Sequence, residues 1–284
     1  MTLTIPEEWK LDNRIVQKAG NCVLDVPKLV LSTEELNITD MSASSLLKRL
    51  QTGELSSYTV TKAFCHRACI GHQLTNCLTS LFCDEALSRA IELDNHFKEH
   101  GPVGPLHGLP VSFKDAFLIR GHKTTFGYLS WKDNVSERDG LPVSIMKSLG
   151  VVPFCQTNIA QGLLSVESTN NIFGTVLNPH NTNLTASGSS GGEAALVAMK
   201  GSPFGMCTDA GGSIRLPASS NAIKLGRVAD RSSIRRLRLH RNLVEGYDRG
   251  RYVPLRLSVP AFFLESGSAP AEVSYWVSLS GRHY

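Results

Sequence analysis

Long apolar runs are missing from this sequence of 284 residues. No run approaches the ~18 consecutive apolar residues that a membrane-spanning helix needs, and the most apolar early stretch, residues 23–31, is interrupted by Asp25 and Lys28. The N-terminus also lacks the basic segment followed by an apolar segment that marks a secretory signal. These absences predict a soluble, cytoplasmic chain that does not bind membranes.

Composition excludes several whole-chain architectures. Apolar residues make up 42% and charged residues 19%, which excludes a disordered, collagenous or coiled-coil chain. The length is enough for one large domain or two ordinary ones with a substantial core. We therefore expect a globular protein.

An even set of cysteines is also missing, because the sequence has seven. Without a secretory signal, an odd number predicts free thiols. The segment 65–77, with three cysteines and two histidines, suggests either a zinc site or one face of a buried helix. Its spacing matches no usual zinc site, whereas cysteine behaves as a small buried hydrophobe, which favours the helix. We assign no metal ligand.

Positive charge is confined to the end of the chain. Residues 224–284 carry 11 Lys and Arg against 5 Asp and Glu, whereas residues 1–223 carry 18 against 20. Basic residues also change from mostly Lys to almost only Arg. We interpret this switch as a boundary, or seam, near residue 224 between the body of the chain and an unrelated tail. The net charge of +4 therefore gives no reason to expect an anionic partner of the folded body.

Hydrophobic periodicity predicts alternating helices and short strands. Residues 1–40 are expected to form an extended N-terminal arm, followed by helices over 42–51, 56–72, 84–100 and 144–149. Asp84 is expected to cap the third helix, whose apolar stripe includes Ile91. Residues 109–113 and 151–155 read as short strands. The pattern indicates an α/β layer fold.

The first glycine- and serine-rich segment, residues 187–193, runs directly into a strong helix former. Such a turn places two hydroxyls at a helix N-terminus. It suggests a phosphate cradle, a passive capping turn or a catalytic serine turn. No lysine follows as in a P-loop, which disfavours the first alternative.

Two further segments carry chemistry-bearing residues. In residues 205–218 two glycines precede Ser213, an arrangement that can expose main-chain N–H groups as an oxyanion hole, with Asp209 and Arg215 able to fix the loop. In residues 104–115, Lys114 follows the predicted strand. It is either a surface lysine paired with Asp115 or, if buried, a base with a lowered pKa.

Together these segments resemble the amidase signature family, and most closely the fungal acetamidase-like general amidases. The resemblance extends from about residue 5 to about residue 222. Besides the two Ser-Gly segments, it includes residues 74–77, 101–110, 114–115, 169–172 and 178–181.

The resemblance implies an amidase signature fold with a mixed β-sheet covered by helices. It also implies an amidohydrolase that cleaves carboxamides to carboxylate and ammonia through an acyl-enzyme, with no metal or cofactor. Lys114 corresponds to the base and Ser189 to the bridging serine, whose peptide bond with Gly188 should be cis. Ser213 corresponds to the nucleophile.

The remaining roles also follow from the resemblance. Ser190 would support the triad by hydrogen bonding, and substrate-binding residues stay unknown. The partner implied is a small amide, with a homodimer possible and no nucleic acid. The main-chain N–H groups that would form the oxyanion hole are those of Ala210, Gly211, Gly212 and Ser213.

The sequence departs from the family both within the matching region and after it. Ser187 and Cys207 replace glycines, and residues 156–160 lack the usual lysine and proline. After residue 222 the resemblance stops, and the chain ends at roughly half the family's usual length. We therefore expect residues 41–222 to be the N-terminal part of the amidase domain, with its C-terminal half missing, and residues 223–284 to be a disordered tail produced by a frame shift or misread splice junction.

Two alternatives follow from the seam. One alternative is a poorly soluble, catalytically inactive fragment, since half of the sheet would be lost. The other alternative is a basic nucleic-acid-binding module, with several tail arginines along one helix face. A solvated tail is the plainer interpretation of the same arginines.

Overall fold

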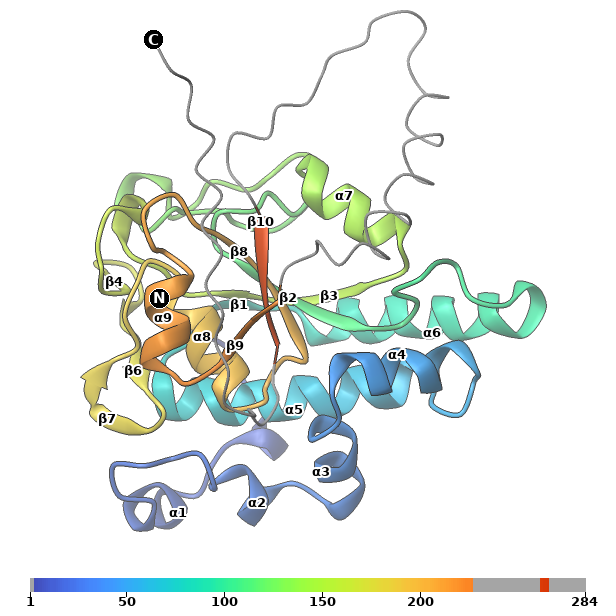
Figure 1. Cartoon of the computed structure of the whole chain (residues 1–284), viewed down its shortest axis with the longest axis horizontal. Coiled ribbons are helices and arrows are strands. Elements are labelled where there is room, and N and C mark those ends of the chain that lie inside the picture. The colour runs from blue at the N-terminus through green and yellow to red at the C-terminus, as the bar shows by residue number, and fades with distance from the viewer. Residues whose placement is uncertain (1–2, 227–260, 266–284) are drawn as a thin grey trace, which may run out of the picture.

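The computed structural model describes residues 3–226 and 261–265 (Figure 1). The α-helices are α1 (Asn13–Lys18), α2 (Pro27–Val30), α3 (Thr33–Thr39), α4 (Ala43–Gln51), α5 (Ser57–Thr75), α6 (Cys83–His100), α7 (Leu141–Ser148), α8 (Gly191–Ala198) and α9 (Arg215–Ser220). Short 3-10 turns are η1 (Glu7–Trp9), η2 (Leu129–Trp131) and η3 (Gln161–Leu163). The strands are β1 (Leu78–Leu81), β2 (Pro110–Lys114), β3 (Val152–Thr157), β4 (Thr169–Asn170), β5 (Gly174–Thr175), β6 (Leu177–Asn178), β7 (Asn181–Thr185), β8 (Phe204–Thr208), β9 (Lys224–Gly226) and β10 (Ala261–Glu265).

One mixed sheet with the strand order β1-β3-β2-β8-β10-β9 forms the centre of the described structure. Strand β2 pairs in parallel with both β3 and β8, whereas β1 and β10 add antiparallel strands on either side. Two small two-stranded sheets, β4-β5 and β6-β7, lie outside it. The predicted α/β class and the mixed sheet are therefore confirmed.

Strand β2 separates an apolar face from a polar face. Val111 and Phe113 belong to a buried cluster that also contains residues of α4, α5 and α7. Because side chains alternate along a strand, Ser112 and Lys114 point to the other face. Helix α8 packs there against β2, β3 and β8. This alternation sets a polar site into a buried sheet.

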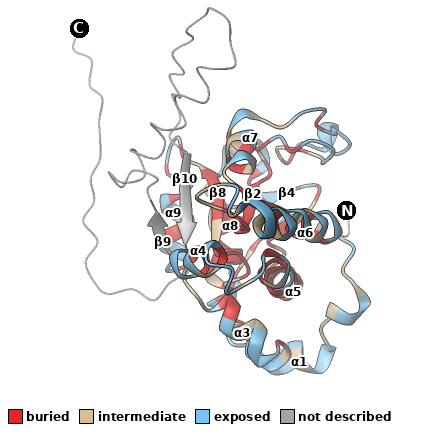
Figure 2. Cartoon of the chain, turned by 90° about the vertical axis from the view of Figure 1, so that its right-hand side faces the viewer, coloured by how far each residue is buried: buried red, intermediate tan, exposed pale blue. Residues whose placement is uncertain are grey.

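Helices α5 and α6 lie side by side beneath the sheet (Figure 1). Helix α5 is mostly buried, as Figure 2 shows, and the side chains of Ser42 and Ser56 cap α4 and α5 at their N-termini. Cys65 and Cys69 are fully buried on α5, as its apolar stripe predicted. The predicted strands and helices are present, with boundaries shifted by up to three residues. The largest shifts are at the C-terminus of α5 and at the N-terminus of α7.

Three expectations about local structure are wrong. Residues 1–40 are not extended throughout, because they contain α1, α2 and α3. Phe82, and not Asp84, is the N-cap of α6, and it forms no side-chain cap. Ile91 is 47% exposed, whereas Leu93 is buried on that helix. The core contact of α6 therefore runs along a slightly different face.

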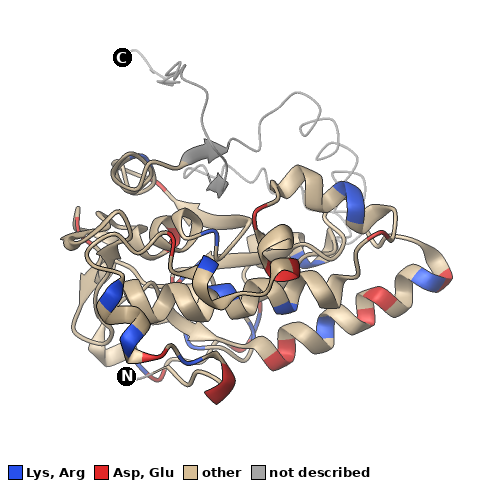
Figure 3. Cartoon of the chain, turned by 90° about the horizontal axis from the view of Figure 1, so that it is seen from below, with Lys and Arg blue, Asp and Glu red and all other residues tan. Residues whose placement is uncertain are grey.

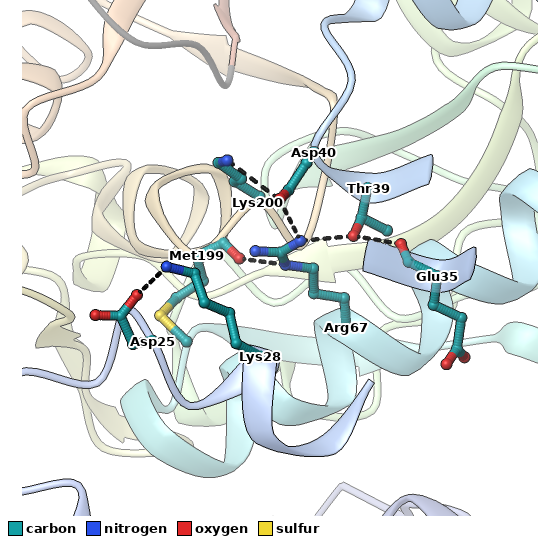
Figure 4. A network of polar contacts seen from close by, with 8 residues as sticks. All are labelled: Asp25, Lys28, Glu35, Thr39, Asp40, Arg67, Met199 and Lys200. Carbon is teal, nitrogen blue, oxygen red and sulfur yellow. Dashed lines mark hydrogen bonds and ion pairs between the residues drawn. The ribbon is translucent and has the colours of Figure 1, made fainter. Parts of the chain in front are cut away.

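Arg67 connects the N-terminal helices to the rest of the structure (Figure 4). It is 3% exposed on α5, and its Nε donates to the carbonyl of Met199 at 2.8 Å. Its Nη1 donates to Thr39 Oγ1 at 2.6 Å and to Asp40 Oδ1 at 2.8 Å. Lys200 also donates to Asp40. One buried cation therefore holds together α3, α5 and the segment after α8.

Replacing Arg67 with methionine should lower the free energy of unfolding by about 2–3 kcal/mol, because several buried polar groups lose their partner. Urea denaturation would measure this change. Lys28→Met is the matched control, since the Lys28–Asp25 ion pair beside this network is exposed. An equal loss in both variants would contradict the assignment of the stabilisation to the buried cation.

Only two pieces of the predicted tail lie within the described residues. Strand β10 pairs with β8 along residues 261–265, and β9 pairs with β10. The expectation of a tail without regular structure does not hold for these two segments, and the rest of the tail, including the arginines considered for nucleic-acid binding, lies outside the described residues.

Charges of both signs are interspersed over the described helices and loops (Figure 3). Within the described part of the chain, no helix has the length and apolarity needed to cross a membrane.

Candidate active site

Lys114 is the last residue of β2 and is completely buried. Its Nζ donates to Ser189 Oγ at 2.7 Å and to Thr208 Oγ1 at 3.3 Å. It is not paired with Asp115, whose carboxylate accepts hydrogen bonds from Thr125. Of the two alternatives for this lysine, the structure thus gives the buried one.

Burial lowers the pKa of Lys114 to about 8, although the negative charge of Asp209 opposes the shift. A larger fraction of Lys114 is consequently present as the free amine at neutral pH than of a surface lysine.

Ser189 and Ser190 enter the site on the turn before α8. The Gly188–Ser189 peptide bond is cis, as the resemblance implies. Both serines are fully buried. The N–H of Ser190 donates to the carbonyl of Ser213 at 3.2 Å, which ties this turn to the loop after β8. Within the described part of the chain the Ser190 hydroxyl forms no hydrogen bond with Lys114, Ser189 or Ser213, so its support of the triad by hydrogen bonding stays a prediction.

Asp209 organises the loop that carries Ser213. Its carboxylate accepts hydrogen bonds from the N–H groups of Gly212, Ile214 and Arg215. The Arg215 side chain adds two more hydrogen bonds. Burial alone would raise the pKa of Asp209, but these hydrogen bonds outweigh it and hold the pKa well below its usual value. The predicted pinning of the loop by Asp209 and Arg215 is thus present.

Comparison with known proteins gives this geometry a context. A family model described as Amidase matches residues 59–224, more than half of the chain. The chain belongs to the amidase family. This amidase-family chain is 46% identical over 77% of its length to an acetamidase from Emericella nidulans, and 43% identical over 78% to an acetamidase from Aspergillus oryzae.

Solved structures agree with this assignment. A fatty acid amide hydrolase superposes with a TM-score of 0.74 at 40% identity, covering 78% of this chain and 41% of that one. The peptide amidase of Stenotrophomonas maltophilia gives a TM-score of 0.62 at 26% identity, covering 66% and 40%. The amidase-family chain also spans only 40% of the length of each of the two acetamidases.

The loop after β8 offers fewer main-chain donors than the sequence predicts. The N–H of Gly212 already donates to Asp209 Oδ1 at 2.7 Å, so the geometry does not support Gly212 as an oxyanion donor. No described residue accepts a hydrogen bond from the N–H groups of Ala210, Gly211 or Ser213. Gly212 has a φ of +121°, which a residue with a side chain would rarely adopt.

The departures from the family pattern are accommodated. Ser187 takes a φ of +65°, and its Oγ donates to the carbonyl of Val166. Cys207 is fully buried on β8, where burial raises the pKa of its thiol far above the usual value. The thiol therefore stays neutral beside Lys114.

Several polar residues of the site were not predicted from the sequence. Thr208 Oγ1 accepts a hydrogen bond from Lys114. Glu193 is in hydrogen-bond contact with Ser112 and Thr157. The alternation of side chains along a strand could have indicated Ser112, because it lies two residues before Lys114 on the same strand and thus shares its face.

Proposed function

We propose that this chain carries the catalytic centre of an amidohydrolase that cleaves carboxamides through a Ser-Ser-Lys triad and an acyl-enzyme. The observation that carries the proposal is the contact of a completely buried lysine, Lys114, with Ser189 Oγ at 2.7 Å. A lysine buried against a hydroxyl is suited to accept its proton.

The mechanism follows from the order of these groups. Ser213 attacks the amide carbonyl, and its proton passes through Ser189 to the neutral amine of Lys114. The N–H groups of Ala210, Gly211 and Ser213 stabilise the oxyanion, since they are the donors of this loop without an internal acceptor. Lys114 then returns the proton to the leaving nitrogen, and water hydrolyses the acyl-enzyme.

Short aliphatic amides are the proposed substrate class. The two relatives with the highest identity reported above are named acetamidases. Their names support a small acyl group, whereas the fatty acid amide hydrolase structure indicates that the same fold serves longer ones. No residue of this chain is assigned to substrate selection.

Ammonia release from acetamide by the purified 284-residue chain tests the proposal. Turnover that disappears in Ser213→Ala supports it. A chain that neither turns over acetamide nor reacts at Ser213 with a fluorophosphonate probe contradicts it and supports the alternative of an inactive fragment.

Salt-dependent binding to DNA that is lost on truncation after residue 223 would support the nucleic-acid-binding alternative.

A further inference from the structure

A chain of hydroxyl groups runs from Glu193 beneath the candidate active site. Glu193 lies in the first turn of α8 and is fully buried. Its Oε1 is in hydrogen-bond contact with Ser112 Oγ. Ser112 Oγ also contacts Ser202 Oγ at 2.8 Å, and Ser202 Oγ contacts the carbonyl of Phe204 at 2.8 Å. Three consecutive contacts thus connect one carboxyl group to one main-chain carbonyl.

The number of hydrogens in this chain decides the charge of Glu193. The carbonyl of Phe204 can only accept, so Ser202 must donate to it. Ser202 then has no second hydrogen, and its contact with Ser112 uses the single hydrogen of Ser112. The contact between Ser112 and Glu193 is left without a hydrogen unless Glu193 supplies one. An ionised Glu193 would leave three contacts with only two hydrogens.

The second carboxyl oxygen fits the same assignment. Thr157 Oγ1 donates to Glu193 Oε2 at 2.8 Å, as it would to the carbonyl oxygen of a carboxylic acid. On the other side, a Cβ at Gly205 would lie 1.9 Å from Oε1, so the glycine is needed to make room for the carboxyl group.

Few of the titratable groups around Glu193 carry a charge that would favour its ionised form. Cys77, Cys155 and Cys207 are fully buried, and burial raises the pKa of each thiol, so all three are neutral. Lys114 is the remaining group that interacts with Glu193, and Asp209 acts on Lys114 from the loop after β8. Burial raises the pKa of Glu193 to about 7 against the opposing hydrogen bonds of Ser112 and Thr157 and the charge of Lys114.

We propose that Glu193 is held as the neutral carboxylic acid up to neutral pH and is a positioning residue that keeps a negative charge away from Lys114 in that range. The protonation state rests on the hydroxyl chain alone, whereas its consequence for Lys114 rests on the proposed function. A carboxylate at this position would favour the protonated amine of Lys114 and so deplete the base.

The protonation state is tested by following the side-chain carboxyl carbon of ¹³C-labelled glutamate through a pH titration of the full chain by NMR. Glu193→Gln assigns the signal, and it should fold like the wild type, since the amide can donate to Ser112 and accept from Thr157. We expect Glu193 to titrate near neutral pH. A Glu193 signal already ionised at pH 5, or a Glu193→Gln chain that does not fold, would overturn the proposal.

Two further variants should move this titration in opposite directions. Ser202→Ala frees the hydrogen of Ser112 to stabilise the carboxylate, so the pKa of Glu193 should fall by about 1–2 pH units. Thr157→Val removes a donor to the carboxylate and should raise it. A pKa that is unchanged or raised in Ser202→Ala would contradict the hydrogen count.

The consequence for Lys114 is read from the pH dependence of fluorophosphonate labelling at Ser213. Above pH 7, where the wild-type Glu193 ionises, Ser213 should be labelled faster in Glu193→Gln than in the wild type, because the neutral amide does not favour the protonated amine of Lys114. Identical pH profiles of labelling, or a labelling rate reduced more than about tenfold, would contradict the positioning role. If the wild-type chain neither labels nor hydrolyses acetamide, the proposed function fails while the NMR result still decides the state of Glu193.

Discussion

Replacing Ser213 with alanine is expected to reduce the rate of ammonia release from acetamide by about 10³- to 10⁶-fold, with little change in stability. The reason is that the hydroxyl would form the acyl-enzyme, and no other group in the loop after β8 can replace it. Ser213 is only partly buried, and its main-chain carbonyl, which binds Ser190, is kept in the variant. The measurement is steady-state turnover together with thermal unfolding.

Ser219→Ala is the matched control for this variant. Ser219 is exposed on the neighbouring helix α9, outside the triad, so its removal should leave turnover unchanged. Residual turnover in Ser213→Ala close to that of the control would contradict the assignment of the nucleophile.

Replacing Lys114 with methionine is expected to reduce turnover and fluorophosphonate labelling of Ser213 by a similar factor, because the relay through Ser189 loses its acceptor. Methionine has a similar length and is apolar, so the buried position should tolerate it. Arginine in the same place should be equally inactive, since the guanidinium does not lose its proton in the working pH range.

The pH dependence provides a second readout for Lys114. In the proposed mechanism the active form is the free amine, and burial lowers the pKa of this lysine to about 8. Turnover should therefore rise as the pH rises through about 8, and fall about tenfold for each pH unit well below it. Lys123→Met, which removes a partly exposed lysine paired with Asp133, should leave this profile unchanged. A wild-type rate that is flat between pH 6 and 9 would contradict the role of Lys114.

Local patterns in the sequence predicted most of the element types. The stripe of Val60, Phe64, Cys65 and Cys69 gave α5, and the apolar run before Lys114 gave β2. The errors lie where local patterns are ambiguous. The segments of α1, α2 and α3 are short and are held by contacts such as those of Arg67 with Thr39 and Asp40, which no periodicity reveals.

The resemblance to amidases identified the residues of the candidate site, but not all of their contacts. It named Gly212 as an oxyanion donor, whereas the folded loop commits that N–H to Asp209. It did not point to Glu193 or Ser112, whose contact joins residues 81 positions apart.

By itself the sequence determined the α/β class, and its resemblance to amidases indicated the family and the residues proposed as nucleophile, bridging serine and base, because such a resemblance depends on residue types in a fixed local order. Only the tertiary structure decided that Lys114 is buried against a serine 75 residues away, and that Glu193 lies at one end of a chain of hydroxyl groups. The physical reason is that proton affinity depends on desolvation and on hydrogen-bond partners. Both are set by which distant segments pack together, and neither is encoded in the spacing of residues along the chain.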